Sequence, residues 1–395
     1  MACNDPALPP AVVLGGWATA LPLVRRLGRE GVEVHALGAA ADPARRSRYA
    51  RFVDLGRGEG MAGRWLEWLV ESAPRGAVVL AASDYGAELI AGNRARLVEA
   101  GLVPMEMNDE AVLIMLDKQR TADLAASLGI PCPRTLPVKE AQDVAGRLDF
   151  PLGLKPVHSH LFHAHFKDKV FRVHDERELN AKLELTSRLG LEMVATELIE
   201  GPDAGIGTYC AYLDERSEVL CEATKQKPRQ YPPKAGTGTL HVSDWCEETA
   251  QLGRRLLTGA RVRGHANVEV KRDERDGQVK LIECNYRFLQ GTALLQAAGF
   301  DIVGFTYNRL TGRPLPSMEY RKGVRGIFLA NDLRAFPGYR RMGELTTGAY
   351  LRSLARPHHP MMLSRDDPGP ALGLYSGMAR KWLVRRAVRR GGPRS

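Results

Sequence analysis

The stretch "VKLIECNYRF", residues 279–288, places three polar side chains at every second position of a short strand. Glu283, Asn285 and Arg287 come directly after residues 279–282, which are typical of a strand entering a core. Residues i, i+2 and i+4 of a strand share one face, so these three side chains should point the same way. Exposure of one strand face to water would explain a single polar pair. An acid, an amide and an arginine in one row instead predict a binding site.

The segment before this stretch predicts the first strand of a hairpin. Residues 275–277 suit a three-residue loop with glycine in the left-handed position, and that loop places Glu269 opposite Glu283. A two-residue loop would pair Glu269 with Cys284 and break the cluster. In the first register two carboxylates and the Asn285 amide oxygen converge. Unpaired carboxylates facing each other would repel, whereas Mg²⁺, or alternatively Mn²⁺, prefers such oxygen ligands.

The N-terminal part of the chain predicts a parallel α/β sheet. Residues 11–37 have the pattern of strand, glycine turn, amphipathic helix and strand, and residues 77–101 repeat the strand and helix. This alternation predicts a parallel sheet over residues 10–115. The turn at Gly15 and Gly16 lacks the full GxGxxG spacing, and no acid ends the second strand. A dinucleotide site is therefore not favoured.

Three further segments contain candidate nucleotide ligands. Lys118 lies in "LDKQR", and Lys155 follows the apolar run of "FPLGLKP", so its ammonium group should emerge at the edge of a core. In "TELIEGPD", backbone groups of residues 197–199 could contact a base, and Asp203 could contact ribose hydroxyls. Taken alone, the lysines are typical solvated side chains and the last segment is a typical strand and turn.

The ordered set of these motifs resembles the ATP-grasp superfamily of carboxylate–amine ligases over roughly residues 10–310. The resemblance implies an α/β and α+β protein, in which a parallel pre-ATP-grasp domain precedes two lobes that hold ATP between them. We therefore expect four regions. They are a pre-ATP-grasp domain (1–115), a small lobe (116–196), a large lobe with the metal-binding hairpin (197–325) and an irregular C-terminal segment with a basic tail (326–395).

The resemblance also implies roles for individual residues. ATP would contact Lys118, Lys155, Glu197, Ile199 and Asp203, of which Lys155 is also catalytic. The metal ligands would be Glu269, Glu283 and Asn285, and Arg287 would stabilise charge on the phosphoryl group or on an acyl-phosphate. The segment "KQKPRQYPPKAGTGT" resembles a loop of D-aspartate ligase relatives, and there an acidic substrate would contact Lys225, Lys227 and Arg229.

The implied activity is ligation that depends on ATP and magnesium. ATP would activate a carboxylate as an acyl-phosphate, and an amine, such as that of an amino acid, would attack it. A carboxylase acting through carboxyphosphate is the alternative within the superfamily, although no biotin-carrier segment or glutaminase motif is present. A nucleotide-binding protein without ligase activity is the alternative from another class, and the retained metal ligands and Arg287 argue against it.

One segment departs from the family pattern. Many members have a glycine-rich phosphate loop after the second lysine, whereas this chain has "PVHSHLFHAHFKDKVF". Its alternating histidines could bind a metal, but no cysteine lies nearby in sequence to complete a zinc site. A basic lid over phosphate or substrate is therefore the favoured interpretation. The histidines are His158, His160, His163 and His165.

Charge and cysteine content indicate the compartment and the partners. The net charge of +10 arises mostly from seven Lys and Arg after Pro368, and no aromatic-interleaved basic stripe predicts a nucleic-acid partner. The tail is either a solvated basic terminus or a peripheral contact with an anionic membrane surface, which would bring the enzyme to a lipid-linked carboxylate or another cell-envelope precursor. Six scattered cysteines and the absence of a signal pattern favour a cytoplasmic protein, peripheral to the inner face of the membrane if the tail binds there.

Overall fold

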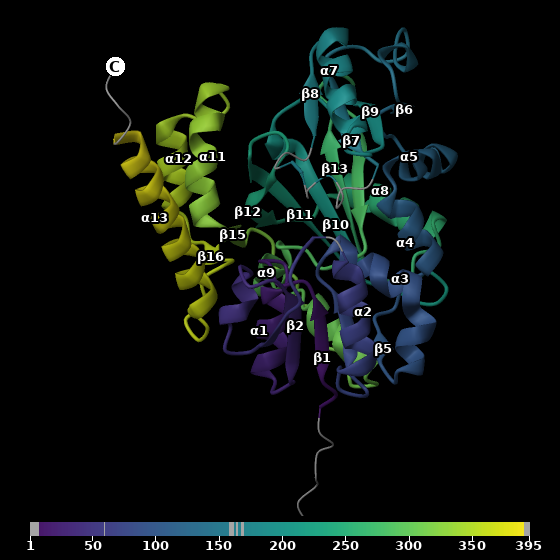
Figure 1. The fold of residues 1–395 in the computed structure, drawn as a ribbon, viewed down its shortest axis with the longest axis vertical. Helices are drawn as coiled ribbons and strands as arrows, with labels where there is room; N and C mark the ends of the chain where they lie inside the picture. The colour runs from purple at the N-terminus through teal and green to yellow at the C-terminus, as the bar shows by residue number, and fades with distance from the viewer. Residues whose placement is uncertain (1–7, 59, 158–161, 163–164, 167–169, 391–395) are drawn as a thin grey trace, which may run out of the picture.

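The computed structural model describes residues 8–58, 60–157, 162, 165–166 and 170–390. The N-terminal sheet, in purple and blue at the bottom of Figure 1, is parallel, as expected. Its five strands have the order β3-β2-β1-β4-β5. All residues of β1 and β4 are buried, because helices pack against this sheet and parallel sheets are covered on both faces. The elements are β1 (Ala11–Leu14), α1 (Leu21–Arg29), β2 (Val34–Gly38), β3 (Arg51–Asp54), α2 (Met61–Glu71), β4 (Val78–Ala81), α3 (Asp84–Glu99) and β5 (Val103–Pro104).

The small lobe is a four-stranded sheet in the order β6-β9-β7-β8, with its own hydrophobic core. It follows α4 (Asp109–Leu116) and α5 (Lys118–Ser127). The lobe is at the top of Figure 1. Its elements are β6 (Thr135–Val138), β7 (Leu152–Pro156), β8 (Phe171–Val173), α7 (Glu176–Ser187) and β9 (Met193–Glu197).

The large lobe is built on a seven-stranded sheet in the order β14-β13-β10-β11-β12-β15-β16. The segment expected to be a substrate loop contributes most of β11 and the start of β12. Its lysines and arginine alternate at positions 225, 227 and 229, which is the two-residue period of a strand. The elements are β10 (Ile206–Leu213), β11 (Val219–Tyr231), β12 (Thr237–Ser243), α8 (Glu247–Gly259), β13 (Gly264–Arg272), β14 (Val279–Asn285), α9 (Thr292–Ala297), α10 (Ile302–Leu310), β15 (Arg325–Ile327) and β16 (His359–Pro360).

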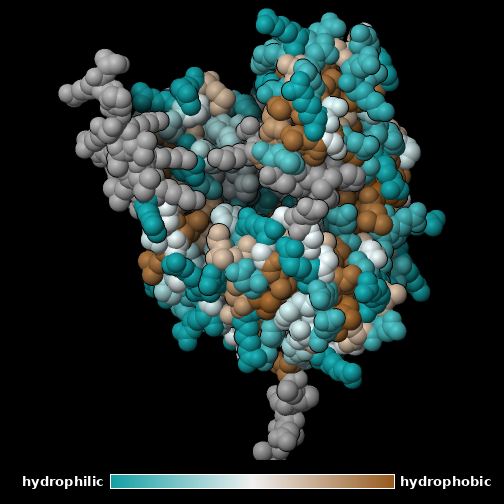
Figure 2. Space-filling view, in the orientation of Figure 1, coloured by the Kyte–Doolittle hydropathy of each residue, from teal (hydrophilic) through white to brown (hydrophobic). Residues whose placement is uncertain are grey.

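The C-terminal segment is not irregular, in contrast to the prediction from its Pro, Gly and Arg content. It contains α11 (Leu329–Arg341), α12 (Thr347–Leu354) and α13 (Gly369–Arg390), which stand at the left of Figure 1. The buried Arg25 and Asp367 join its last part to α1, with Nε and Oδ2 2.9 Å apart. Figure 2 shows a hollow between these helices and the small lobe. In the part of the chain that is described, no helix is long and apolar enough to span a membrane.

Candidate active site

The hairpin of β13 and β14 has the register that brings the two carboxylates together. Glu269 pairs with Glu283, and Asn267 pairs with Asn285. The connection differs from the predicted three-residue loop, because Asp273 and Gln278 close a wider turn and the register shifts between Glu269 and Val270. This β-bulge compensates for the different turn and restores the pairing. Gly277 has the predicted left-handed conformation, with φ of +72°.

The contacts of the hairpin carboxylates are compatible with a bound divalent cation. Lys227 Nζ lies 2.8 Å from Glu269 Oε1, and Asn285 Nδ2 donates to Glu283 Oε1 at 3.1 Å. The amide nitrogen of Asn285 therefore faces the carboxylate, and its oxygen remains as a candidate ligand. Two carboxylates on neighbouring strands and one amide oxygen suit Mg²⁺ or Mn²⁺. No group of three or more His, Cys, Asp or Glu residues suited to a metal occurs among the residues described.

Two predicted phosphate-binding lysines lie within electrostatic range of this hairpin although they come from other elements. Lys118 begins α5, directly after the capping residue Asp117, and Lys155 lies near the end of β7. Burial lowers the pKa of Lys118 to about 8, against an opposing effect of Glu283. Burial also lowers the pKa of Lys155, which Glu283 and Glu269 oppose. Both ammonium groups thus lie within electrostatic range of Glu283, and their contact with the phosphates of ATP stays a prediction.

Arg287 forms an ion pair with a residue that the sequence analysis missed. Its guanidinium donates from Nε and Nη2 to the two carboxylate oxygens of Asp84, the Nη2 contact being 3.3 Å. Burial alone would lower the pKa of Arg287, but the charges of Asp84, Glu283 and Glu269 raise it. Asp84 is the first residue of α3, at the carboxyl end of β4. Ligands of open parallel sheets bind at that edge, so the position of "SDYG" after an apolar strand could have indicated this residue.

The three predicted substrate contacts lie on one face of β11 and are almost fully buried. Lys225 Nζ donates to Thr208 Oγ1 at 2.9 Å, and burial lowers the pKa of Lys225 to about 8. Lys227 contacts Glu269 and therefore borders the hairpin. Arg229 lies farther along the strand, where it donates to both carboxylate oxygens of Asp332 at 2.8 and 2.9 Å. The two lysines therefore lie near the hairpin carboxylates, whereas Arg229 forms an ion pair with Asp332 of α11.

The predicted adenine and ribose contacts have partners within the chain. Glu197 accepts hydrogen bonds from the backbone and the side chain of Arg134, at 3.0 and 2.7 Å. The carbonyl oxygen of Ile199 accepts one from Lys271 Nζ at 2.7 Å. Asp203 is 1% exposed. Its carboxylate accepts hydrogen bonds from Gln230 Nε2, from the backbone nitrogen of Lys234 and from the hydroxyl of Tyr339. The roles of these residues toward ATP remain predictions.

The histidine-rich segment falls largely outside the described residues. His158, His160 and His163 are not described, so the lid and metal interpretations of this segment have no structural test. His165 is described, and its backbone nitrogen donates to the carbonyl of Phe162 at 3.0 Å.

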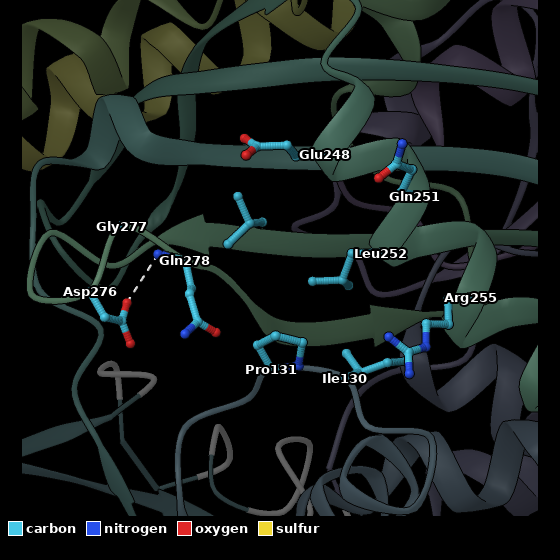
Figure 3. Close-up of a pocket in the computed structure, with 10 residues that line it drawn as sticks. Ile130, Pro131, Glu248, Gln251, Leu252, Arg255, Asp276, Gly277 and Gln278 are labelled. Atoms are coloured by element: carbon cyan, nitrogen blue, oxygen red, sulfur yellow. Dashed lines mark hydrogen bonds between the residues drawn. The ribbon is translucent and has the colours of Figure 1, made fainter.

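A shallow pocket of about 470 Å³ lies at the edge of the large sheet, away from these side chains. Figure 3 shows that α8 contributes Glu248, Gln251, Leu252 and Arg255 to its lining, and that the turn of the β13–β14 hairpin closes one side. The linker before β6 contributes Ile130 and Pro131. None of the predicted site residues lines this pocket, so it carries no argument about the chemistry.

Comparisons with known proteins agree with the fold. No family model matches the chain. It is 26% identical to a D-aspartate ligase of Enterococcus faecium (strain Aus0004) over 257 residues, which are 62% of this chain and 61% of that protein. The chain therefore spans less than two thirds of that curated relative.

Two solved structures have a similar fold at low sequence identity. An N5-carboxyaminoimidazole ribonucleotide synthetase in its ADP complex matches with a TM-score of 0.63 at 13% identity, over 85% of each chain. An L-amino acid ligase from Bacillus licheniformis matches with a TM-score of 0.57 at 18% identity, over 79% of this chain and 76% of that one. The chain thus has the fold of the ATP-grasp superfamily and is a distant homologue of D-aspartate ligase.

Proposed function

We propose that this protein is an ATP-dependent ligase that joins a carboxylate to an amine. The observation that carries the proposal is the pairing of Glu269 with Glu283 in the hairpin, where Lys227 Nζ lies 2.8 Å from Glu269 Oε1. Lys118, Lys155 and Arg287 each have a pKa influenced by Glu283. Cations around oxygen ligands are the arrangement that phosphoryl transfer requires, since catalysis of this reaction rests on positioning and electrostatic stabilisation.

In the proposed reaction, the carboxylate attacks the γ-phosphate of ATP, and ADP leaves. The amine then attacks the acyl-phosphate, and phosphate leaves. Lys118 and Lys155 hold the phosphates of ATP, and Arg287 holds the transferred group. A magnesium ion bound by Glu269, Glu283 and Asn285 would neutralise charge on the phosphates. Lys225 and Lys227 bind the acidic substrate, for which D-aspartate is the first candidate because of the relative's name.

The test is ADP release by the purified protein with MgATP, D-aspartate and pooled amino acids as amines. We expect turnover that needs both the acid and the amine, and a Lys155→Met variant that is strongly impaired. Lys139→Met is the matched control, because Lys139 is an exposed lysine of the same lobe. ADP release that needs bicarbonate instead of an amine would favour the carboxylase. No turnover with any acid would contradict the proposal.

A further inference from the structure

Asp84 is a carboxylate beside the hairpin that is neither a predicted metal ligand nor part of the predicted adenine-binding segment. The site also contains the cations Lys118, Lys155, Lys225, Lys227 and Arg287, of which Arg287 pairs with Asp84 and Lys118 lies within its electrostatic range. Both Glu269 and Glu283 are expected to bind the metal, and Glu269 also contacts Lys227. An amine substrate arrives as an ammonium ion at neutral pH. In such surroundings it would be repelled unless a carboxylate accepts it.

The position of Asp84 is fixed from two sides. Ser83 Oγ accepts a hydrogen bond from the backbone of Gly86 at 3.1 Å and donates to the carbonyl of Leu14 at 2.9 Å, which holds the start of α3 against β1. The backbone nitrogen of Phe288, next to Arg287, donates to the carbonyl of Ala81 at the end of β4, at 3.0 Å. The N-terminal sheet and the hairpin strand therefore hold Asp84 and Arg287 together.

The Asp84 carboxylate has capacity left for a ligand. Each of its oxygens accepts one hydrogen bond from Arg287, whereas an ionised carboxylate offers about four acceptor sites. Its side chain is 31% exposed, compared with 19% for that of Arg287. Asp84 also acts on the pKa of Lys118, so it lies within electrostatic range of a predicted phosphate-binding group.

We propose that Asp84 binds the ammonium group of the amine substrate and accepts its proton, an inference that rests on the proposed ligase function. One proton passes from the ammonium nitrogen to a carboxylate oxygen of Asp84, and the freed lone pair forms the bond to the acyl carbon. The carbon–oxygen bond to phosphate breaks, and phosphate leaves with the electron pair. The second proton of the nitrogen leaves with phosphate or solvent. Arg287, held by the same carboxylate, stays beside the departing phosphate.

Hydroxylamine distinguishes this role from a general one, because it is uncharged near neutral pH and attacks an acyl-phosphate without giving up a proton first. The Asp84→Asn variant is assayed with MgATP and D-aspartate in two arms, one with pooled L-amino acids and one with hydroxylamine. Amide formation should fall by about 100-fold or more, the usual contribution of a general base, while hydroxamate formation stays close to that of the unmodified protein. Raising the pH should partly restore amide formation by deprotonating the amine.

The controls distinguish a loss of the Asp84 carboxylate from a variant that does not fold and from a protein without ligase activity. Asp54→Asn is the matched variant, because Asp54 is an exposed acid at the end of β3, a strand of the same sheet, and both reactions should be unchanged. If Asp84→Asn does not fold, Asp84→Glu keeps the charge but displaces it, and should still slow amide more than hydroxamate formation. Equal losses in both arms, or none, would overturn the role of Asp84. Absence of both products with the unmodified protein would instead contradict the proposed function.

Discussion

The β13–β14 hairpin and the β9–β10 connection were both predicted to contact ATP or its metal, but they differ in what their side chains do. In the hairpin, Glu269 and Glu283 face each other and act on the pKa of lysines from other elements. In the connection, Asp203 is enclosed by three hydrogen-bond donors of its own chain. A carboxylate surrounded by partners is expected to stabilise the fold, whereas carboxylates that face each other are expected to serve a ligand. This contrast can be tested residue by residue.

The largest effect is expected in the hairpin. Glu283→Gln keeps the shape of the side chain and removes a charge from the predicted metal site, so ADP release should fall by about 100-fold or more while the fold is retained. Steady-state ADP release and circular dichroism measure the two quantities. If the folded Glu283→Gln protein released ADP at the rate of the unmodified protein, Glu283 would not be a metal ligand.

For Asp203→Asn we expect a loss of stability with little change in ATP affinity. The change leaves donors of the Asp203 cluster unsatisfied in the interior, which should lower the free energy of unfolding by about 1–3 kcal/mol. Urea denaturation measures this loss, with the exposed Asp149→Asn as the control. ATP affinity of the folded variant should change little. A large loss of ATP affinity at unchanged stability would return Asp203 to the ribose role and break the contrast between the two regions.

Strand periodicity accounts for what could be predicted from sequence. Alternation predicted that Glu283, Asn285 and Arg287 share one face, because side chains on one face of a strand do not depend on distant segments. The pairing of Glu269 with Glu283 was predicted from a three-residue loop, and it occurs although the loop differs. The turn length was wrong, since a β-bulge can compensate for a different loop and leaves no clear sequence signal.

Residues whose partners lie far along the chain could not be predicted in the same way. Asp84 and Arg287 are separated by 203 positions, and only the packing of the N-terminal sheet against the hairpin brings them together. The buried pair of Arg229 and Asp332 has the same origin. Because the resemblance from which Arg229 was assigned covers roughly residues 10–310 and α11 lies beyond that range, its partner was not anticipated.

A smaller effect is expected from the protonation of Lys225. Burial, together with the charge of Lys227, lowers the pKa of Lys225 to about 8 and outweighs the raising effects of Glu269 and Cys210. The ammonium form that binds an acidic substrate is therefore lost as pH rises through this value, and each pH unit above it lowers that form about tenfold. KM for the acid should rise correspondingly above about pH 8 in the unmodified protein.

Lys225→Met tests the assignment of this pH dependence. The variant should have a high KM for the acid at every pH, since it has no charge to lose, and its profile should be flat in this range. Steady-state kinetics at saturating ATP across the range measures both features. A profile that rises as in the unmodified protein would assign the titration to another group.

The smallest effect on turnover is expected from the basic tail, although it tests a separate property. Helix α13 packs against the N-terminal domain through Gly369 and Gly373, which lie close to Arg46. A chain ending at Gly377 keeps this contact and should retain its ADP release.

The shortened chain lacks the seven basic residues beyond Gly377, each of which contributes about 1 kcal/mol near an anionic surface. The full chain should therefore sediment with anionic vesicles at low salt and be released as salt rises, whereas the shortened chain should stay in solution. Equal sedimentation of both chains would mean that the tail is a solvated terminus and that any membrane contact comes from another surface.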